Sequence, residues 1–310
     1  MELRGPEAGP FPLTWGEGNM WESMLAFGPR SNRLNPAGIS RVKHPVRVRD
    51  ALPRIERDLN QFDILRATFD EKRVEQTFQG QARVGVLVCD TSVFPERGRE
   101  LESGGLHTFL GAGFPMAAFD LCEAPIRIGL LHLDGIITHL ILLLSHLPFD
   151  GAAYPLLMRP LLAAVEGREV PAPGMRTETL LQYEQSAESV RGSDAVIRRW
   201  IDTATRPRPG RGLMSTTVGR YSMIALRSRA AAIAAQVLAV RTRTSTTSVA
   251  LAALTKTIHR HVDRELSAML LVCNNRWQPQ LKNFVGQTLG TGCCRFPRTT
   301  SAGTCRPIPG

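Results

Sequence analysis

A histidine, an aspartate and a glycine stand close together near the middle of the sequence, in the segment Ser145-His146-Leu147-Pro148-Phe149-Asp150-Gly151. A histidine side chain exchanges protons near neutral pH, so His146 can take a proton from an attacking amine or hydroxyl and return it to a leaving group. Gly151 permits a tight backbone path after the carboxylate of Asp150. The arrangement suits acyl transfer. Taken alone it is a weak motif, and the competing interpretation is a histidine satisfied at a strand end.

The elements on either side would place this segment at the mouth of a strand. Two apolar runs, 126–133 and 136–144, are joined by Asp134-Gly135. Asp-Gly between apolar runs predicts a β-hairpin, because a type I′ turn needs positive φ at both central positions. The second strand then delivers the chain to His146. A helix is expected from about Ala152 to Val165, with Pro155 in its first turn and a kink at Pro160.

Other parts of the chain alternate between helix and strand patterns. Apolar residues recur at helical spacing from Val48 to Phe62 after the candidate cap Asp50, and Trp15 and Trp21 are expected to anchor the Pro- and Gly-rich start in a core. His132 and His139 are expected to face each other across the hairpin. Further expectations are strands near 74–78 and 84–88, two alanine-rich helices within 227–261 that separate near 242–247, and a buried strand at 269–273.

Composition and charge describe a globular chain without a strong nucleic-acid signal. The 310 residues are 43% hydrophobic, which is enough for a core, and the net charge is +10. The basic residues are nearly all arginines, scattered along the chain and not interleaved with aromatic residues. Nucleic-acid binding is therefore unsupported. A basic surface would also suit an acidic protein partner.

The sequence favours a cytoplasmic location without membrane or metal chemistry. The start shows no secretory pattern, and the longest apolar stretch, 136–144, is too short to cross a bilayer. The six cysteines form no Cys-x-x-Cys pair, so neither a zinc site nor a disulfide framework is predicted. His259 and His261 lie two positions apart on a predicted helix and make poor metal ligands.

Several separated segments resemble, in order, the motifs of the condensation domains of nonribosomal peptide synthetases, a branch of the chloramphenicol-acetyltransferase-like superfamily. Together with the His146 segment they span roughly residues 10 to 290. Gln61 and Phe62 depart from that family's pattern, in which Arg and His are usual. The matching segments are Pro12-Leu13-Thr14 with Trp21, Leu65-Arg66-Ala67-Thr68-Phe69, Phe119-Asp120-Leu121 with Ala124-Pro125-Ile126-Arg127, and Asn274-Asn275-Arg276 with Val285-Gly286.

The resemblance assigns a role to each residue of the central segment. His146 matches the histidine that faces the substrate tunnel, whereas Ser145 replaces the family's first histidine. Because consecutive strand residues face opposite ways, Ser145 is expected to point away from the tunnel. The resemblance makes Asp150 a structural residue paired with Arg66. Gly151 supports the loop, and Tyr154 is expected near the tunnel.

The implied fold is α/β, with the two lobes of a chloramphenicol-acetyltransferase-like protein and an incomplete second lobe. Residues 1–170 would form the N-terminal lobe with the His-x-x-x-Asp-Gly loop. Residues 171–217 would form a linker and a connecting helix, and residues 218–310 a partial C-terminal lobe. The stretch from Arg295 to Gly310 is a polar, Pro-rich tail where condensation domains continue.

The resemblance implies an acyltransferase of condensation type, which joins a carrier-bound acyl or peptidyl thioester to an amine or hydroxyl. The acyl donor would be carried on the phosphopantetheine arm of an acyl or peptidyl carrier protein, or on coenzyme A, and no bound cofactor or metal is expected. The partners would be the carrier protein and a small amine or alcohol acceptor. The alternative is a non-catalytic condensation-like module that binds a carrier protein or recruits a tailoring enzyme, and a third possibility is an inactive, truncated remnant.

Overall fold

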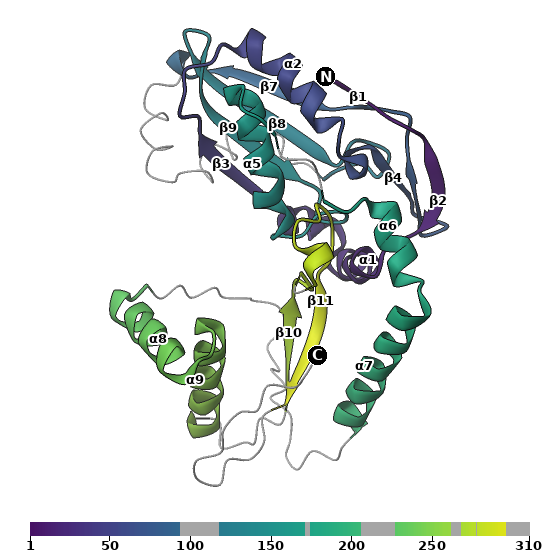
Figure 1. Ribbon diagram of the computed structural model, residues 1–310, viewed down its shortest axis with the longest axis vertical. Helices are drawn as coiled ribbons and strands as arrows, with labels where there is room; N and C mark the ends of the chain where they lie inside the picture. The colour runs from purple at the N-terminus through teal and green to yellow at the C-terminus, as the bar shows by residue number, and fades with distance from the viewer. Residues whose placement is uncertain (94–117, 171–173, 206–226, 262–267, 277, 296–310) are drawn as a thin grey trace. The chain divides into compact units, whose positions relative to one another are not determined.

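The computed structural model describes residues 1–93, 118–170, 174–205, 227–261, 268–276 and 278–295 (Figure 1). The chain divides into two compact units. The first combines Met1–Gly192 with Val272–Gly290, and the second combines Ser193–Leu271 with Thr291–Gly310. The His146 segment lies in the first unit, together with residues 272–290 from much later in the sequence.

A four-stranded sheet forms the centre of the first unit, in the order β3-β9-β8-β7. β3 (Ala37–Arg41) and β8 (Ile126–Leu133) both run antiparallel to β9 (Ile136–Leu144), whereas β7 (Gly85–Asp90) runs parallel to β8. The predicted hairpin is confirmed, because Leu133 pairs with Ile136 and the two turn residues, Asp134 and Gly135, have φ of 52° and 77°.

The register of this hairpin contradicts one expectation. His139 lies opposite Leu131, and His132 lies opposite Ile137, so the two histidines do not face each other. The cause is the two-residue turn itself: it pairs Leu133 with Ile136, so the next pair is His132 with Ile137, and a register shift between Leu131 and His132 then places His139 opposite Leu131. His132 instead accepts a hydrogen bond from the backbone N–H of Gly135 through Nδ1, at 3.2 Å, and so belongs to the turn.

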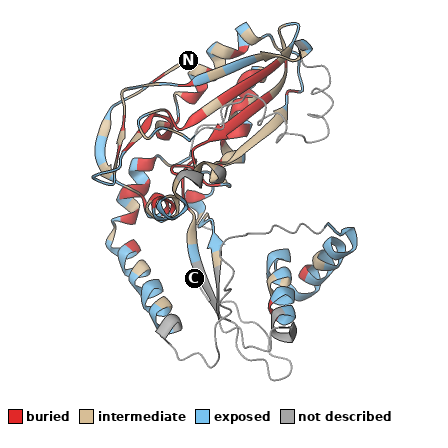
Figure 2. Cartoon of the chain, turned by 180° about the vertical axis from the view of Figure 1, so that it is seen from behind, coloured by how far each residue is buried: buried red, intermediate tan, exposed pale blue. Residues whose placement is uncertain are grey.

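Helices α2 (Val48–Leu59) and α5 (Ala153–Glu166) pack against each other, and α5 also contacts β9. Figure 2 shows the buried residues concentrated in the strands of the sheet and on the helix sides that face it. The predicted spacing on α2 is confirmed, since Ile55 and Leu59 are buried in the same core cluster as Leu157 and Leu161 of α5. The α2 cap differs, because Arg47 is the N-cap and Asp50 lies in the first turn.

α5 begins and ends close to its expected bounds. Pro155 lies in its first turn and Pro160 inside it. The helix ends at Gly167, which has φ of 69°, the left-handed conformation that glycine adopts without steric cost. The first helical residue, Ala153, is close enough to the His146 segment for the helix to fix one end of that loop.

Smaller strands and the first helix complete this unit. β1 (Glu2–Arg4) pairs with β6 (Gln81–Arg83), and β5 (Glu75–Phe78) lies between β2 (Ala8–Pro12) and β4 (Ala67–Asp70). Helix α1 (Trp15–Phe27) begins with a capping box, in which the Thr14 hydroxyl accepts from the N–H of Glu17 and the Glu17 carboxylate accepts from the N–H of Thr14. Only one of the two expected anchors is buried: Trp21 is 8% exposed, whereas Trp15 is 49% exposed.

The remaining elements include both of the predicted alanine-rich helices, α8 (Arg229–Thr242) and α9 (Thr246–His261), and these two helices contact each other. β10 (Ala268–Cys273) pairs with β11 (Gly290–Arg295). The predicted strand is therefore present, but its burial is wrong for Val272, which is 72% exposed. A two-stranded sheet leaves such positions without a covering layer. The other elements are η1 (Gly28–Leu34), η2 (Asp63–Arg66), η3 (Thr91–Val93), η4 (Pro279–Leu281), α6 (Thr177–Glu184) and α7 (Ala187–Thr205).

Candidate active site

His146 lies in the loop between β9 and α5, and three protein groups hold it. Its backbone N–H donates to Oδ1 of Asn35 at 2.9 Å, and its backbone carbonyl accepts from Nε2 of Gln287 at 2.7 Å. Its ring Nδ1 lies 2.7 Å from the carbonyl oxygen of Phe149. A carbonyl oxygen can only accept, so we assign the ring proton to Nδ1 and the lone pair to Nε2.

The other ring nitrogen of His146 is the chemically available one. The side chain is half-buried, and within the described part of the chain Nε2 has no hydrogen-bond partner. An imidazole with Nδ1 bound to a carbonyl and Nε2 unoccupied has the form of a general base whose orientation is fixed before a substrate arrives. This geometry is the strongest chemical feature of the site.

Asp150 is fully buried, and both of its carboxylate oxygens are occupied. Oδ1 accepts from the backbone N–H of Ala153 at 2.7 Å, which satisfies a free donor at the start of α5. Oδ2 accepts from Nη1 of Arg276 at 2.5 Å and from the backbone N–H of Thr288 at 3.0 Å. A carboxylate saturated in this way organises the loop around it and has no free oxygen to exchange a proton with a substrate.

The expected pairing of Asp150 with Arg66 is wrong, because Arg276 occupies that place. Arg276 is 6% exposed at its side chain and also donates to the backbone carbonyls of Phe284 and Gly286, at 3.2 and 2.8 Å. Arg66 lies elsewhere, with Nη1 donating to the carbonyls of Pro6 and Gln79 at 3.0 and 2.6 Å. Burial lowers the pKa of the Arg66 guanidinium.

The structure places the other predicted site residues without testing their roles. Ser145 is buried, and its backbone N–H donates to the carbonyl of Pro125 at 2.9 Å. Gly151 lies in a tight turn, as expected, because the N–H of Ala153 donates to the carbonyl of Asp150 at 3.1 Å. Its φ lies outside the left-handed region, and a Cβ added to it would meet nothing within 4 Å. The absence of a side chain at Gly151 therefore leaves open space beside the loop.

Tyr154 lies in the first turn of α5 and turns toward the sheet. Its hydroxyl packs closely against Gly38 of β3, where a Cβ would collide with it. The hydroxyl is buried and has no hydrogen-bond partner among the residues that the structure describes, and burial raises the pKa of Tyr154. Its position near a substrate tunnel stays a prediction.

Three residues that hold the loop were not identified from the sequence as site residues. Asn35 lies 111 positions before His146, and Gln287 lies 141 positions after it. Thr288 binds Asp150. None of these residue types stands out in its local sequence. The only signal was the neighbouring Val285-Gly286, which carried part of the family resemblance.

Two buried glutamates accept hydrogen bonds at the start of α1: Glu17, in its first turn, and Glu184, the last residue of α6. Gly16 of the same helix packs against the backbone of Gln287. Oε2 of Glu17 accepts from the backbone N–H of Thr14 at 2.8 Å and from Nε2 of Gln76 at 2.7 Å, and Oε2 of Glu184 accepts from the backbone N–H of Trp15 at 2.9 Å. Burial raises the pKa of Glu17 to about 7. It raises the pKa of Glu184 to about 7 as well, with a contribution from the charge of Glu17.

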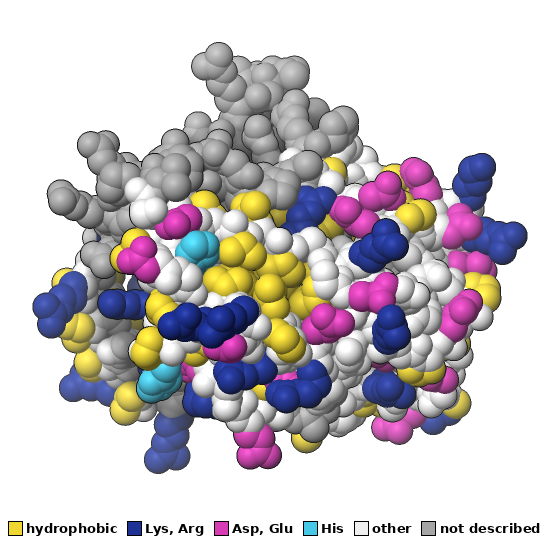
Figure 3. Space-filling view, turned by 90° about the horizontal axis from the view of Figure 1, so that it is seen from above, with side chains coloured by type: hydrophobic (Ala, Val, Ile, Leu, Met, Phe, Trp, Pro, Cys, Tyr) yellow, Lys and Arg dark blue, Asp and Glu magenta, His cyan; other side chains and the backbone are white. Residues whose placement is uncertain are grey.

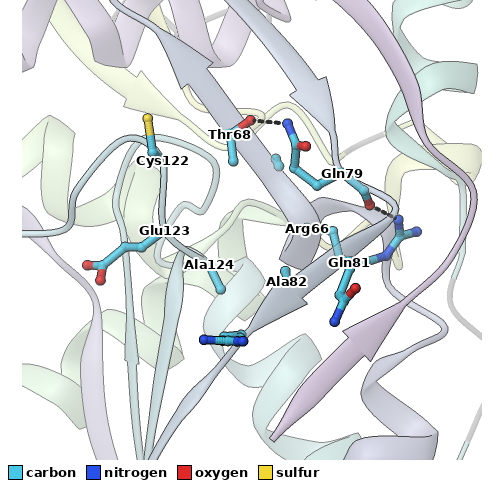
Figure 4. A pocket seen from close by; sticks show the side chains of 10 residues that line it. Arg66, Thr68, Gln79, Gln81, Ala82, Cys122, Glu123 and Ala124 are labelled. Atoms are coloured by element: carbon cyan, nitrogen blue, oxygen red, sulfur yellow. Dashed lines mark hydrogen bonds between the residues drawn. The ribbon is translucent and has the colours of Figure 1, made fainter.

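A separate pocket of about 240 Å³ is bordered by β4, β6 and the turn before β8 (Figure 4). Its lining includes Thr68, Gln81 and Glu123, but not His146. Figure 4 shows Gln79 bound to Thr68 through its side chain and to Arg66 through its carbonyl, so the Arg66 guanidinium is engaged with the backbone. We assign no chemistry to this pocket.

The described surface shows no dominant charge track on the face seen in Figure 3, where Lys and Arg side chains are interspersed with Asp and Glu around an apolar area. Among the described residues, no group of three or more His, Cys, Asp or Glu is placed to hold a metal ion, and Cys89 and Cys122 are free thiols. Within the same residues, no helix has both the length and the apolar character needed to span a bilayer.

Solved structures with a similar backbone define the class of fold as the α/β, chloramphenicol-acetyltransferase-like one. More narrowly, the chain has the condensation-domain fold. It superposes on the condensation domain of the monacolin K polyketide synthase MokA with a TM-score of 0.74 at 14% identity, covering 96% of this chain and 69% of that one. Part of the MokA domain therefore has no counterpart here.

Two further likenesses broaden the comparison. A structure on condensation domain-mediated chain release from the enacyloxin polyketide synthase matches with a TM-score of 0.69 at 18% identity, covering 96% of this chain and 59% of that one. The complex of the X-domain and OxyB from teicoplanin biosynthesis matches with a TM-score of 0.64 at 16% identity, covering 94% and 66%. No family model and no curated protein sequence matches the chain. At these identities the likeness concerns the fold.

Proposed function

We propose that this chain is an acyltransferase of condensation type, with His146 as the general base or positioning residue. An amine or hydroxyl would attack an acyl or peptidyl thioester, forming the new C–N or C–O bond while the C–S bond breaks. His146 Nε2 would take the proton of the nucleophile and pass it to the departing thiolate. The observation that carries the proposal is the anchoring of His146 at its N–H, its carbonyl and Nδ1, which leaves Nε2 unoccupied.

The proposed donor and acceptor are those that the resemblance to condensation domains implies. The acyl group would be presented on the phosphopantetheine arm of a carrier protein or on coenzyme A, and a small amine or alcohol would accept it. No bound cofactor is required, because a thioester is already an activated acyl group. The backbone N–H of Gly151, which has no partner among the described residues and borders open space, would be available to the oxyanion. Asp150, Arg276 and Thr288 would keep the loop in shape.

A second candidate function is a non-catalytic module that binds a carrier protein or recruits a tailoring enzyme. Ser145, Gln61 and Phe62 replace residues that are usual in the catalytic family, which favours this alternative. The similar X-domain was solved in a complex with OxyB, so a domain with this fold can bind another protein. The alternative predicts binding without turnover.

One experiment separates the two functions. The purified chain is incubated with acyl thioesters, on a carrier protein and on coenzyme A, together with amine and alcohol acceptors, and product is measured by mass spectrometry. Carrier binding is measured separately by calorimetry. We expect turnover that falls at least 100-fold in His146→Ala, the range of a lost general base. His44→Ala, at an exposed histidine, is the matched control and is expected to retain activity.

The outcomes are distinct. Turnover that is unchanged in His146→Ala would refute the mechanism. Carrier binding with no turnover in the unmodified chain would favour the recruiting module.

A further inference from the structure

Gln287 is a buried glutamine whose side-chain amide is fixed at both ends. Only 1% of the residue is exposed. Its Nε2 donates to the carbonyl of His146 at 2.7 Å and lies 3.5 Å from the ring Nδ1, while its Oε1 accepts from the backbone N–H of Leu289 at 3.2 Å. Burying an amide is costly unless it is hydrogen-bonded. Here the compensating bonds run from the amide nitrogen to His146 and from the backbone N–H of Leu289 to the amide oxygen.

The backbone that carries Gln287 is held from two directions. On one side, Gly16 of α1 lies so close that a Cβ there would be 2.8 Å from the carbonyl carbon of Gln287 and 3.1 Å from Cα of Thr288. On the other side, the N–H of Thr288 donates to Asp150 at 3.0 Å. The side chain therefore extends toward His146 from a fixed base.

We infer that Gln287 is a positioning residue for His146, and this inference rests on the proposed function where it concerns rate. Asn35 fixes the N–H of His146 and the Phe149 carbonyl fixes Nδ1. Among the described residues, Gln287 is the one whose side chain donates to the His146 carbonyl, and its amide nitrogen lies beside the ring. Losing the amide leaves a buried carbonyl unpaired and frees the loop to move relative to Nδ1. The imidazole then exchanges between its Nδ1–H and Nε2–H forms, and Nε2 no longer points in one fixed direction.

The chain offers a matched control for this role. Gln76 is also a glutamine that is 1% exposed, and its Nε2 donates to the carbonyl of Pro12 and to Glu17 rather than to the His146 loop. Gln287→Met and Gln76→Met each remove one buried amide at nearly constant volume. If burial alone mattered, the two variants would behave alike. Gln287→Glu keeps the shape of the side chain but replaces the donating nitrogen by an oxygen opposite the His146 carbonyl. This variant replaces Gln287→Met in the tests if Gln287→Met does not fold.

The first test requires no activity. Long-range ¹⁵N–¹H spectra of the histidine-labelled chain, with His146 assigned by comparison with His146→Ala, report which ring nitrogen carries the proton. We expect the unmodified chain and Gln76→Met to show the Nδ1–H form. We expect Gln287→Met or Gln287→Glu to show averaged Nδ1 and Nε2 signals. Unchanged His146 signals in a folded Gln287 variant would overturn the inference.

The second test measures the rate of the acyl transfer that the proposed function assigns to this chain. We expect Gln287→Met to lower kcat about 10- to 100-fold with little change in KM, the range for a misplaced catalytic group. Added to His146→Ala, the same change is expected to alter the remaining rate less than twofold. An equal loss in both backgrounds would overturn the inference, since Gln287 would then act independently of His146. If the unmodified chain shows no turnover, the proposed function fails, and the spectra alone decide the role of Gln287.

Discussion

Removing the Asp150 carboxylate is expected to lower the free energy of unfolding by about 4–6 kcal/mol. In Asp150→Ala the guanidinium of Arg276, 6% exposed, loses its only ion-pair partner among the described residues. Breaking a buried pair in this way costs about 3–5 kcal/mol, because the remaining charge stays buried without compensation. The buried backbone N–H of Thr288 also loses its acceptor, which adds about 1 kcal/mol.

The pair is tested by a double-mutant cycle. Arg276→Met is expected to cost about 3–5 kcal/mol for the same reason, because it leaves the fully buried Asp150 without its ion-pair partner. The double variant contains neither charge, so its cost should fall short of the sum of the two single costs by about 2–3 kcal/mol. Urea unfolding, followed by the fluorescence of the tryptophans, among which Trp21 is buried in the same unit, gives these free energies by linear extrapolation.

Arg66→Met is the control for this cycle. Arg66 binds the carbonyls of Pro6 and Gln79 and not Asp150, so its cost and that of Asp150→Ala should add within about 0.5 kcal/mol. Coupling of Asp150 to Arg66, or single variants of Asp150 and Arg276 within about 1 kcal/mol of the unmodified chain, would refute the reasoning from the structure.

Three further perturbations follow from the fold. Because burial raises the pKa of both Glu17 and Glu184 to about 7, the folded state binds a proton more tightly than the unfolded state; this stabilisation is complete below about pH 4.5 and is lost as pH rises through 7. For each proton released, the free energy of unfolding should therefore fall by about 2–3 kcal/mol between pH 5 and 8. Urea unfolding of Glu17→Gln across that range should show a smaller decrease than the unmodified chain. Thr14→Ala removes the α1 cap and should cost about 0.5–2 kcal/mol in urea unfolding, with Thr257→Ala, on the exposed side of α9, close to neutral. Gly135→Ala forces a Cβ into φ of 77° and should cost about 1–2 kcal/mol, whereas Gly85→Ala, at a glycine with open space around it, should cost less; equal midpoints would contradict this account of the turn.

Local features of the fold were predictable from the sequence because neighbouring residues determine them. The Asp134-Gly135 turn needs only positive φ at two adjacent positions, and the sequence contains the residues that tolerate it. The apolar spacing of α2 and the bounds of α5 follow from side-chain periodicity in the same way. The expected facing of His132 and His139 does not agree with that same turn, because a two-residue turn pairs His132 with Ile137. The irregularity between Leu131 and His132, which places His139 opposite Leu131, has no sign in the local sequence.

The partners within the site were beyond local reasoning for a different reason. Asp150 needs a cation, and both Arg66 and Arg276 stand in segments that resemble family motifs, so spacing alone did not choose between them. The choice depends on which segment the folded chain brings against the loop, across 126 positions of sequence. Asn35 and Gln287 contact His146 through backbone groups, and a contact to the backbone leaves no mark on the identity of the residue contacted.

The first unit is assembled from two stretches of chain, and all of the chain between them, the excursion from Ser193 to Leu271, belongs to the second unit. Closing a flexible loop costs entropy that grows only with the logarithm of its length, so doubling this excursion adds about 0.6 kcal/mol. The stability of the His146 loop should therefore depend little on the length of this excursion, provided that its two ends can still meet. Insertions or deletions there should be tolerated far better than one residue added between Arg276 and Thr288, where it would displace Arg276 or Thr288 from Asp150 and Gln287 from His146.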